Sequence, residues 1–352
     1  MEKDNKTINI NKKGQDTSDK IHKKKMNKVL KVFLIILLIL FLFVGIAFTS
    51  GYVYLNNKIG KMNKETIDTG AVGITDTTAQ ELKTYTNIAL LGIDSRADDY
   101  DLGNRSDCIM IASINNKTKD IKLISVYRDT YVNVLENGQE RLDKITHAYS
   151  YGGAQNTLKS LNEALDLNVT QYMTVNFEAV KEIVNSVGGI DITITSEEVP
   201  HVPNISSAGT YTLNGEQALA YSRIRYATGG DYKRTERMRT VLTKIIGKMK
   251  EKNISELNRL TDELLPKVST NITSSEIISL IPDIARYNIS DSIGWPYETR
   301  GITLDRWYGV PCTLESNVVK LHKEVFEQTD YEAPDDVKTM SNAIIKKTGY
   351  KN

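Results

Sequence analysis

The stretch "SDCIMIASINNKTKDIKLISVYRDTYV", residues 106–132, holds two apolar runs separated by the polar segment Asn115 to Asp120. Short apolar runs bounded by turn residues are typical of buried strands, and a short polar join between them predicts a hairpin. The preceding run "TNIALLGID", residues 86–94, predicts another buried strand, which ends in an acid. We therefore expect neighbouring strands at the centre of the fold.

Helical patterns follow these strands along the chain. Apolar residues recur at helical spacing after Ala154 and again after Phe177, and Gly188-Gly189 should end the second of these helices before the strand "IDITI". Asn214 is a suitable N-cap for "GEQALAYSR". Another amphipathic helix is predicted from Met238, Val241, Leu242, Ile245, Ile246 and Met249. The mixture predicts an α/β protein in which helices flank a mixed central sheet as an αβα-type sandwich.

The N-terminus predicts the topology. Residues 1–31 hold ten lysines against four acids and little apolar pattern, which indicates a disordered tail. Residues 32–55, "VFLIILLILFLFVGIAFTSGYVYL", carry no charge and are long enough for a transmembrane helix. A cleaved signal peptide is the alternative, but its apolar region would be shorter. The lysine excess before the helix places the N-terminus in the cytoplasm and the rest of the chain outside the cell membrane.

The remaining chain divides by composition. Residues 56–84 are polar and rich in Thr and Asp, and we expect a stalk. Residues 85–352 show no internal repeat and are expected to form one domain. A net charge of +1 and an extracytoplasmic position argue against a nucleic-acid partner.

Arginine is concentrated in "RIRYATGGDYKRTERMR", residues 223–239, which contains five of the thirteen arginines of the chain. A guanidinium presents a planar fork of donors that matches two phosphate or carboxylate oxygens at once, which an ammonium does not. The stretch therefore indicates a phosphate site, although a solvated basic helix face is the commoner reason for a charge run. Arg128 and Asp129 also follow a strand end, and no glycine-rich P-loop motif is present.

Two acids occupy the strand ends. Asp94 ends one predicted strand and Asp107 begins the next, so their carboxylates could converge at one edge of the sheet. Mg²⁺ typically takes one or two carboxylates together with water and substrate phosphate oxygens. Arg96 and Arg105 flank these acids, and ordinary salt bridges are the alternative explanation for each pairing.

The cysteines and histidines give weaker signals. Cys108 and Cys312 lie in a compartment that permits oxidation, and the sequence leaves a disulfide and two free thiols equally open. The histidines lack the spacing of a zinc site, and we expect His147 to be structural.

Six motifs, in order, resemble those of the LytR-CpsA-Psr family of bacterial envelope proteins. The likeness is strong from Asn87 to Arg239 and looser over the rest of the ectodomain. The motifs are "NIALLGIDSR", "NRSDCIMIASI", "LISVYRDTYV", "KITHAYSYGG", "YMTVNFEAVKEIVNSVGGIDI" and "LNGEQALAYSRIRYATGGDYKRTERMR".

The resemblance implies a phosphotransferase that moves an anionic glycopolymer from undecaprenyl diphosphate to a sugar hydroxyl of peptidoglycan. It implies an apolar tunnel for the lipid and an arginine-rich mouth for the diphosphate. Asp94 and Asp107 would hold Mg²⁺, and Asp94 is also our candidate for the base. The diphosphate would be bound by Arg105, Arg128, Arg223, Arg225, Arg234 and Arg237, of which the first four would act in catalysis with Asp94.

The chain departs from the family at one position. Glutamine usually follows the arginine that corresponds to Arg237, whereas this chain has Met238 there. A contact to the lipid phosphate could be lost as a result. Asp231 and Arg239 are weaker candidates for the site, and Arg239 is expected to face solvent. A lipid-diphosphate hydrolase and a non-catalytic regulator that binds lipid phosphate remain as alternatives.

Overall fold

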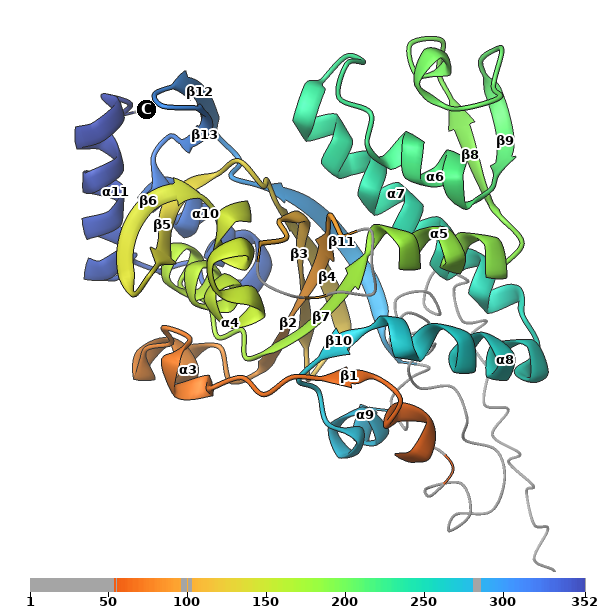
Figure 1. Cartoon of the computed structure of the whole chain (residues 1–352). Coiled ribbons are helices and arrows are strands. Elements are labelled where there is room, and N and C mark those ends of the chain that lie inside the picture. The colour runs from red at the N-terminus through yellow and green to blue at the C-terminus, as the bar shows by residue number, and fades with distance from the viewer. Residues whose placement is uncertain (1–53, 55, 96–99, 101–102, 281–285, 352) are drawn as a thin grey trace, which may run out of the picture.

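The computed structural model describes residues 54, 56–95, 100, 103–280 and 286–351. A seven-stranded sheet lies at its centre (Figure 1). Its strands, in spatial order, are β1 (Asn63–Lys64), β10 (Ser269–Thr270), β7 (Gln171–Asn176), β2 (Tyr85–Ile93), β3 (Ser106–Asn115), β4 (Asp120–Val126) and β11 (Asn288–Trp295). The sheet contains three parallel and three antiparallel strand pairs, so the predicted mixed sheet is confirmed.

Three two-stranded hairpins lie outside this sheet. They pair β5 (Tyr131–Glu136) with β6 (Gln139–Lys144), β8 (Ile190–Ile194) with β9 (Gly209–Leu213), and β12 (Thr299–Thr303) with β13 (Trp307–Pro311). Within the sheet, β3 and β4 pair antiparallel, as the two apolar runs in residues 106–132 predicted.

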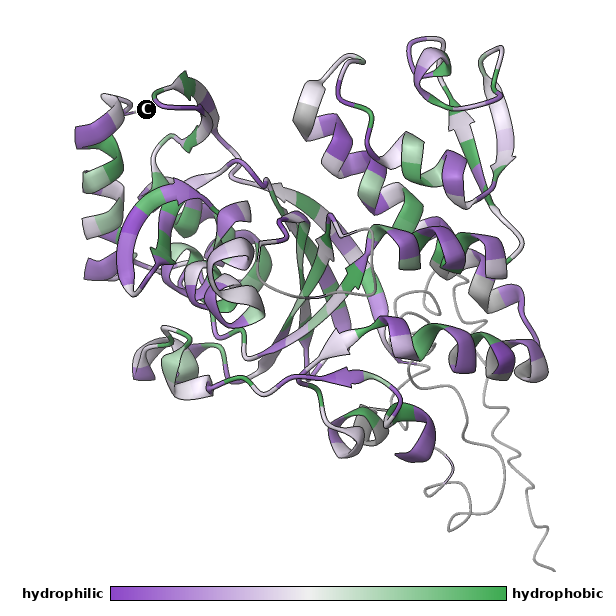
Figure 2. Cartoon of the chain, viewed as in Figure 1, coloured by the Kyte–Doolittle hydropathy of each residue, from purple (hydrophilic) through white to green (hydrophobic). Residues whose placement is uncertain are grey.

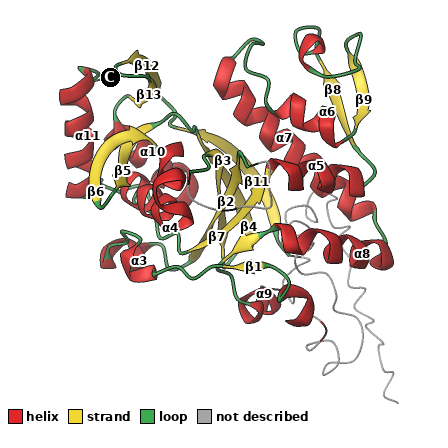
Figure 3. Cartoon of the chain, in the orientation of Figure 1, coloured by secondary structure: helices red, strands yellow, loops and turns green. Residues whose placement is uncertain are grey.

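Helices cover both faces of the sheet (Figure 3). They are α3 (Asp76–Glu81), α4 (Thr146–Leu165), α5 (Phe177–Ser186), α6 (Gly215–Ser222), α7 (Gly230–Glu251), α8 (Ile254–Leu264), α9 (Ser274–Leu280), α10 (Leu314–Phe326) and α11 (Asp335–Thr348). Short 3-10 turns occur at η2 (Thr69–Ala71), η3 (Val199–His201) and η4 (Leu265–Lys267).

The predicted helix boundaries have clear local causes. Gly188 and Gly189, with φ of 87° and 86°, follow α5 in a conformation that side chains with a Cβ rarely adopt. Asn214 caps α6, and its side chain and that of Gln217 form a reciprocal capping box. The helix predicted after Ala154 is confirmed, but α4 begins earlier and is kinked at Gly153, whose φ is 62°.

Alternating side chains of the central strands enter two different cores. Ile109 and Ile111 of β3 pack with α4, α10 and α11, whereas Ala112 and Ile114 face the other side, with Ile277 of α9. Both faces of these strands are therefore apolar, and much of the central sheet is coloured as hydrophobic in Figure 2. This pattern is expected for a sheet that is buried on both sides.

Residues 56–84 do not form the stalk that their polar composition indicated. β1 adds a strand to the edge of the sheet, and Ile59, Val72 and Leu82 are all at most 1% exposed. The prediction was wrong because a few well-spaced apolar side chains are enough to fix a mostly polar segment to an existing core.

The predicted tail and nearly all of the predicted transmembrane helix, residues 1–53 and 55, lie outside the described residues. Within the described part of the chain, every helix is too short or too polar to span a bilayer.

Candidate active site

The ends of β2, β3 and β4 meet at one edge of the sheet. Gly92 pairs with Cys108 and Ile93 pairs with Ser106, which leaves Asp107 as the extra residue of a β-bulge. The backbone N–H of Asp94 donates to the carbonyl of Arg105 at 3.1 Å. The two predicted acids thus lie on neighbouring strands, and the bulge directs Asp107 out of the regular alternation.

Three arginines surround the Asp107 carboxylate, which is 7% exposed. Arg128 Nη1 donates to Oδ1 at 2.6 Å. Arg225 Nη2 and Arg234 Nη1 lie 3.8 and 3.9 Å from Oδ2, within the range of an ion pair but too far for a hydrogen bond. The three guanidinium groups offset the cost of placing this carboxylate where it has little contact with water.

Asp94 and Arg223 form the exposed part of the same cluster. Arg223 Nη2 lies 3.7 Å from Asp94 Oδ1, and the two side chains are 47% and 43% exposed. The guanidinium carbon of Arg223 lies 5.1 Å from the ring centre of Phe177, where a cation is attracted to the aromatic face. This contact ties Arg223 to the first residue of α5.

The cluster is rich in guanidinium groups. Those of Arg128, Arg223, Arg225 and Arg234 face the carboxylates of Asp94 and Asp107. Several guanidinium groups gathered in this way are suited to binding the oxygens of a phosphate-like anion. Three of the four contacts are long, so these guanidinium groups can turn to an incoming oxygen without losing a short hydrogen bond to Asp94 or Asp107.

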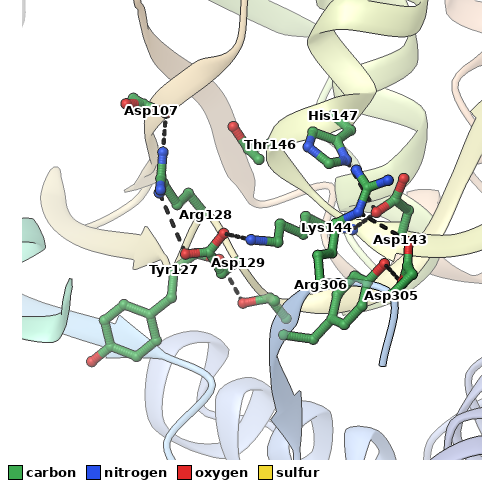
Figure 4. Close-up of polar contacts among 12 residues, drawn as sticks. Asp107, Tyr127, Arg128, Asp129, Asp143, Lys144, Thr146, His147, Asp305 and Arg306 are labelled. Atoms are coloured by element: carbon green, nitrogen blue, oxygen red, sulfur yellow. Dashed lines mark hydrogen bonds and ion pairs between the residues drawn. The ribbon is translucent and has the colours of Figure 1, made fainter. Parts of the chain in front are cut away.

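Arg128 is fixed between two carboxylates (Figure 4). Its Nε lies 3.4 Å from Asp129 Oδ2, on the side opposite to Asp107. Lys144 Nζ lies 2.7 Å from the other oxygen of Asp129, so these two charges balance each other. Asp129, paired with Lys144, therefore orients Arg128.

The other candidate residues lie in different surroundings. Arg237 is buried and donates to Glu198 Oε1 at 2.7 Å and to the Ile224 carbonyl at 3.2 Å. Its guanidinium is therefore directed to Glu198 and Ile224 and not to Asp94 or Asp107. Arg105 is exposed next to the bulge. Arg96 and the side chain of Asp231 lie outside the described part of the structure.

The expectation that Arg239 faces solvent was wrong. Its side chain is half-buried, and Nη1 donates to the Ile293 carbonyl of β11 at 3.1 Å. The reason is that α7 packs along β11, which turns this position of the helix toward the sheet.

An apolar cavity of about 160 Å³ opens beside the cluster. It lies between β7, β2 and β3 on one side and α5 to α8 on the other. Phe177, which underlies Arg223, and Ser222, its neighbour, both line it, so the arginines stand at its mouth. The rest of the lining is almost entirely apolar and includes Leu90, Met110, Val175, Val180, Ile183, Leu219, Val241, Leu242 and Ile245.

Met238 and Cys108 both line the cavity, which explains why apolar side chains occupy these two positions. Met238 is buried and adds to the apolar wall, four residues after Arg234 on the same face of α7. Burial raises the pKa of the Cys108 thiol to about 12, so it stays protonated and is not a nucleophile at neutral pH. Cys108 and Cys312 are both free thiols.

His147 belongs to a neighbouring structural network, as expected. Its Nδ1 lies 3.0 Å from Oδ1 of the fully buried Asp143, and the Tyr151 hydroxyl donates to Oδ2 at 3.0 Å. Burial alone would raise the pKa of Asp143, but the hydrogen bonds from His147, the Lys144 N–H and Tyr151 outweigh it and lower this pKa to about 2. His147 thus stabilises the charged carboxylate behind Lys144 (Figure 4).

Among the described residues no three acidic, histidine or cysteine side chains gather into a metal-binding group. Asp94 and Asp107 remain a pair of oxygen donors on adjacent strand ends. Such a pair fits a Mg²⁺ ion that takes its other ligands from water and phosphate.

Some parts of the site were not predicted. Lys144 pairs with Asp129, which contacts Arg128, and Glu198 pairs with Arg237. Neither Lys144 nor Glu198 has a distinguishing sequence signal, because its partner lies in another segment of the chain. Phe177 was predicted as a helix residue, but its place beneath Arg223 depends on β7 ending beside β2.

Taken together, the mixed sheet, the arginine cluster and the apolar cavity define an α/β protein with a cationic site at the mouth of an apolar cavity. The sequence model of the LytR_cpsA_psr family matches residues 49–294. The chain belongs to this family.

Characterised relatives and a solved structure resemble the chain. The polyisoprenyl-teichoic acid–peptidoglycan teichoic acid transferase TagU of Enterococcus faecalis (strain ATCC 700802 / V583) is 34% identical over 70% of this chain and 80% of the relative. TagT of Bacillus subtilis (strain 168), a transferase of the same description, is 34% identical over 61% of this chain and 70% of its own length. A solved structure of TagT bound to LIIa-WTA matches with a TM-score of 0.53 at 27% identity, over 76% of this chain and 92% of that one.

Proposed function

We propose that this chain is a phosphotransferase that moves an anionic glycopolymer from a polyprenyl-diphosphate carrier to a sugar hydroxyl of peptidoglycan. The observation that carries the proposal is the position of four arginines around Asp94 and Asp107 at the mouth of an apolar cavity. A diphosphate joined to a lipid has both parts of this arrangement. The teichoic acid transferases among the relatives supply the reaction class.

The arginines stabilise the negative charge that develops during the reaction. When a hydroxyl attacks a diphosphate, negative charge spreads over the oxygens of phosphorus and onto the leaving phosphate. Arg128, held from both sides, is already oriented toward this charge, and Arg223 and Arg225 can turn to it. Donors that are in place before the reaction stabilise its transition state without reorganisation.

The carboxylates have two further roles in the proposal. Asp94 is exposed beside Arg223 and can accept the proton of the attacking hydroxyl. Asp94 and Asp107 would hold a Mg²⁺ ion, which when bound supplies additional positive charge at the diphosphate oxygens.

Membrane attachment is the second part of the proposal. The uncharged residues 32–55 would form a single transmembrane helix with the lysine-rich N-terminus in the cytoplasm. The folded domain would then act on the outer side of the membrane, where peptidoglycan is found. Protease added to intact protoplasts should digest the domain, and complete protection would contradict this topology.

The decisive experiment supplies the full chain, in detergent micelles, with a lipid-diphosphate glycan and soluble peptidoglycan fragments. A covalent glycan–peptidoglycan conjugate is the expected product. Free glycan phosphate alone would indicate a hydrolase, and binding without turnover would indicate a regulator.

Substitution then tests the assigned carboxylates. Asp94→Asn and Asp107→Asn remove a charge at constant size, and each should abolish conjugate formation. The exposed Asp94 should tolerate the change with little loss of thermal stability, whereas Asp107→Asn should also lower the melting temperature, because Arg128 and Arg234 lose a buried partner. Asp330→Asn is the matched control, because Asp330 is exposed in the loop between α10 and α11. Native rates for both site variants in limiting Mg²⁺ would show that the metal site is misplaced.

A further inference from the structure

An open groove of about 400 Å³ lies between the end of β4, the start of α7 and the segment that joins β11 to β12. Its volume is within the range of about 300 to 1,000 Å³ that is usual for small-molecule sites. Among the described residues it shares no lining side chain with the apolar cavity. We call it the tyrosine groove, after a lining that includes Tyr127, Tyr232, Tyr297, Glu298, Thr299 and Arg300.

Two segments contribute to both the tyrosine groove and the arginine cluster. Tyr127 directly precedes Arg128, and its ring points away from the guanidinium (Figure 4). Tyr232 lies two residues before Arg234 on α7, and side chains two apart on a helix point in nearly opposite directions. The two tyrosine rings pack edge to face with centroids 4.6 Å apart, and both line the groove.

Strand order places the groove and the cavity on different sides of the cluster. The cavity is lined from β7, β2 and β3, whereas the groove lies at the ends of β4 and β11, farther along the sheet. Phosphoryl transfer requires the attacking and leaving oxygens to lie roughly in line on opposite sides of phosphorus. A lipid phosphate that leaves toward the cavity therefore requires a hydroxyl that enters from the side of the groove.

The lining of the tyrosine groove suits a carbohydrate. Aromatic faces accommodate the apolar C–H face of a pyranose ring, and the phenol hydroxyls can also form hydrogen bonds. Glu298 offers acceptors, Arg300 offers donors and Thr299 offers both, which matches hydroxyl groups better than an anion or an alkyl chain.

The polar side of the groove is rigidly mounted. The Glu298 N–H donates to Asn317 Oδ1 at 2.9 Å, and its carbonyl accepts from the Cys312 N–H at 3.0 Å and from Asn317 Nδ2 at 3.1 Å. The exposed Glu298 side chain therefore projects from a fixed backbone, which favours recognition of one orientation of a ligand.

We propose that the tyrosine groove binds the sugar that carries the attacking hydroxyl, that is, the acceptor glycan. This inference rests on the proposed transfer reaction. The acceptor oxygen forms a bond to the phosphorus that carries the polymer, the bond from this phosphorus to the bridging oxygen breaks, and polyprenyl monophosphate leaves with the electron pair. The hydroxyl proton passes to Asp94 and then to water.

The test compares Tyr232→Ala and Glu298→Gln with Trp307→Ala, an exposed aromatic residue outside the groove. The full chain in detergent micelles is supplied with octaprenyl-diphosphate glycan as donor and soluble uncross-linked peptidoglycan chains as acceptor. Both groove variants should raise the KM for the acceptor about tenfold, which corresponds to about 1.4 kcal/mol. The KM for the donor and the melting temperature should stay unchanged, and Trp307→Ala should behave as the native chain.

Unchanged acceptor KM in both groove variants, or a rise in the donor KM instead, would overturn the inference. If the native chain forms no conjugate at all, the proposed function fails. Calorimetric titration with the peptidoglycan chains then tests separately whether the groove binds a glycan. Binding that is lost in Tyr232→Ala supports a glycan site, whereas equal binding by the native chain and the variant, or none by either, refutes it.

Discussion

The two faces of the central sheet are equally apolar in sequence but differ in how they are filled. On one face, β2 and β3 share a single core with α4, α10 and α11, in which residues such as Leu158 and Leu161 are fully buried. The other face is divided between two cores. Residues of β2, β3 and β4 share one of them with α9. In the other, α5 to α8 pack mainly on one another and on the hairpin of β8 and β9, and this core includes no residue of the central strands. The cavity lies where this second core meets the sheet.

This difference shows how a protein can keep an apolar space open. Helices whose own side chains already fill a separate core need not close completely on the sheet beneath them. The first face then provides stability and the second provides room for a ligand. The predictions below test this division, beginning with the largest expected effect.

Filling the cavity should abolish lipid binding without unfolding the protein. Val175→Phe, at a half-buried residue of β7 that lines the cavity, would displace a lipid segment. Loss of burial for about five methylene groups, at about 0.8 kcal/mol each, corresponds to roughly a thousandfold weaker binding. Binding of octaprenyl diphosphate and thermal unfolding are the measurements.

The matched change on the closed face is Val318→Phe, at a fully buried residue of α10. Overpacking there should lower the free energy of unfolding by about 1 to 3 kcal/mol and leave lipid binding unchanged. Native lipid affinity of Val175→Phe would mean that the cavity is not the lipid site.

Arg223 tests the polar rim of the open face. Arg223→Lys keeps the charge but replaces the planar fork, and transfer should fall about a hundredfold, or about 3 kcal/mol. Arg225→Lys should behave similarly. Because Arg239 is half-buried, the control is Arg259→Lys on the surface of α8, where the side chain is 63% exposed and pairs with Glu263. The measurement is the transfer rate of each variant at saturating Mg²⁺. Near-native rates for both Arg223→Lys and Arg225→Lys would show that transfer does not require the guanidinium fork.

Equal truncations on the two faces should have unequal effects on stability. Leu161→Ala removes a fully buried side chain of the closed face and should lower the free energy of unfolding by about 3 kcal/mol. Leu242→Ala affects a half-buried residue that already borders the cavity, and about 1 kcal/mol is expected. Urea denaturation measures both, and equal losses would show that the open face is as well packed as the closed one.

The low pKa of Asp143 predicts how the free energy of unfolding depends on pH. Its pKa in the folded protein, about 2, lies below the ordinary value of 3.8, so its contribution is present above about pH 4 and is lost as the pH falls toward 2. A shift of this size corresponds to about 2 kcal/mol. Asp143→Asn should remove this part of the acid dependence of unfolding, and an unchanged profile would show that other groups determine it.

Sequence alone placed much of the site because the relevant residues are tied to strand ends. Asp94, Asp107 and Arg128 each lie directly next to an apolar run in the sequence. Because strands that are consecutive in the chain also pair in the sheet, the ends that carry these residues lie close together. Arg223 and Arg225 were predicted as phosphate ligands, and both reach the acids of the cluster, with Arg223 in the helical conformation of the α6 C-cap. Buried Ile224 between them fixes their direction.

The sequence by itself therefore determined the strands, the capped helices, the family and the acids and arginines that could meet a diphosphate. Periodicity and local hydrogen bonding act over a few residues and can be read directly. Only the tertiary structure decided that residues 56–84 join the core, that Arg237 turns to Glu198 and Arg239 to β11, and which apolar face stays open. These outcomes depend on packing between segments that are distant in the chain, and an apolar side chain has the same sequence signal whether it fills a core or lines a cavity.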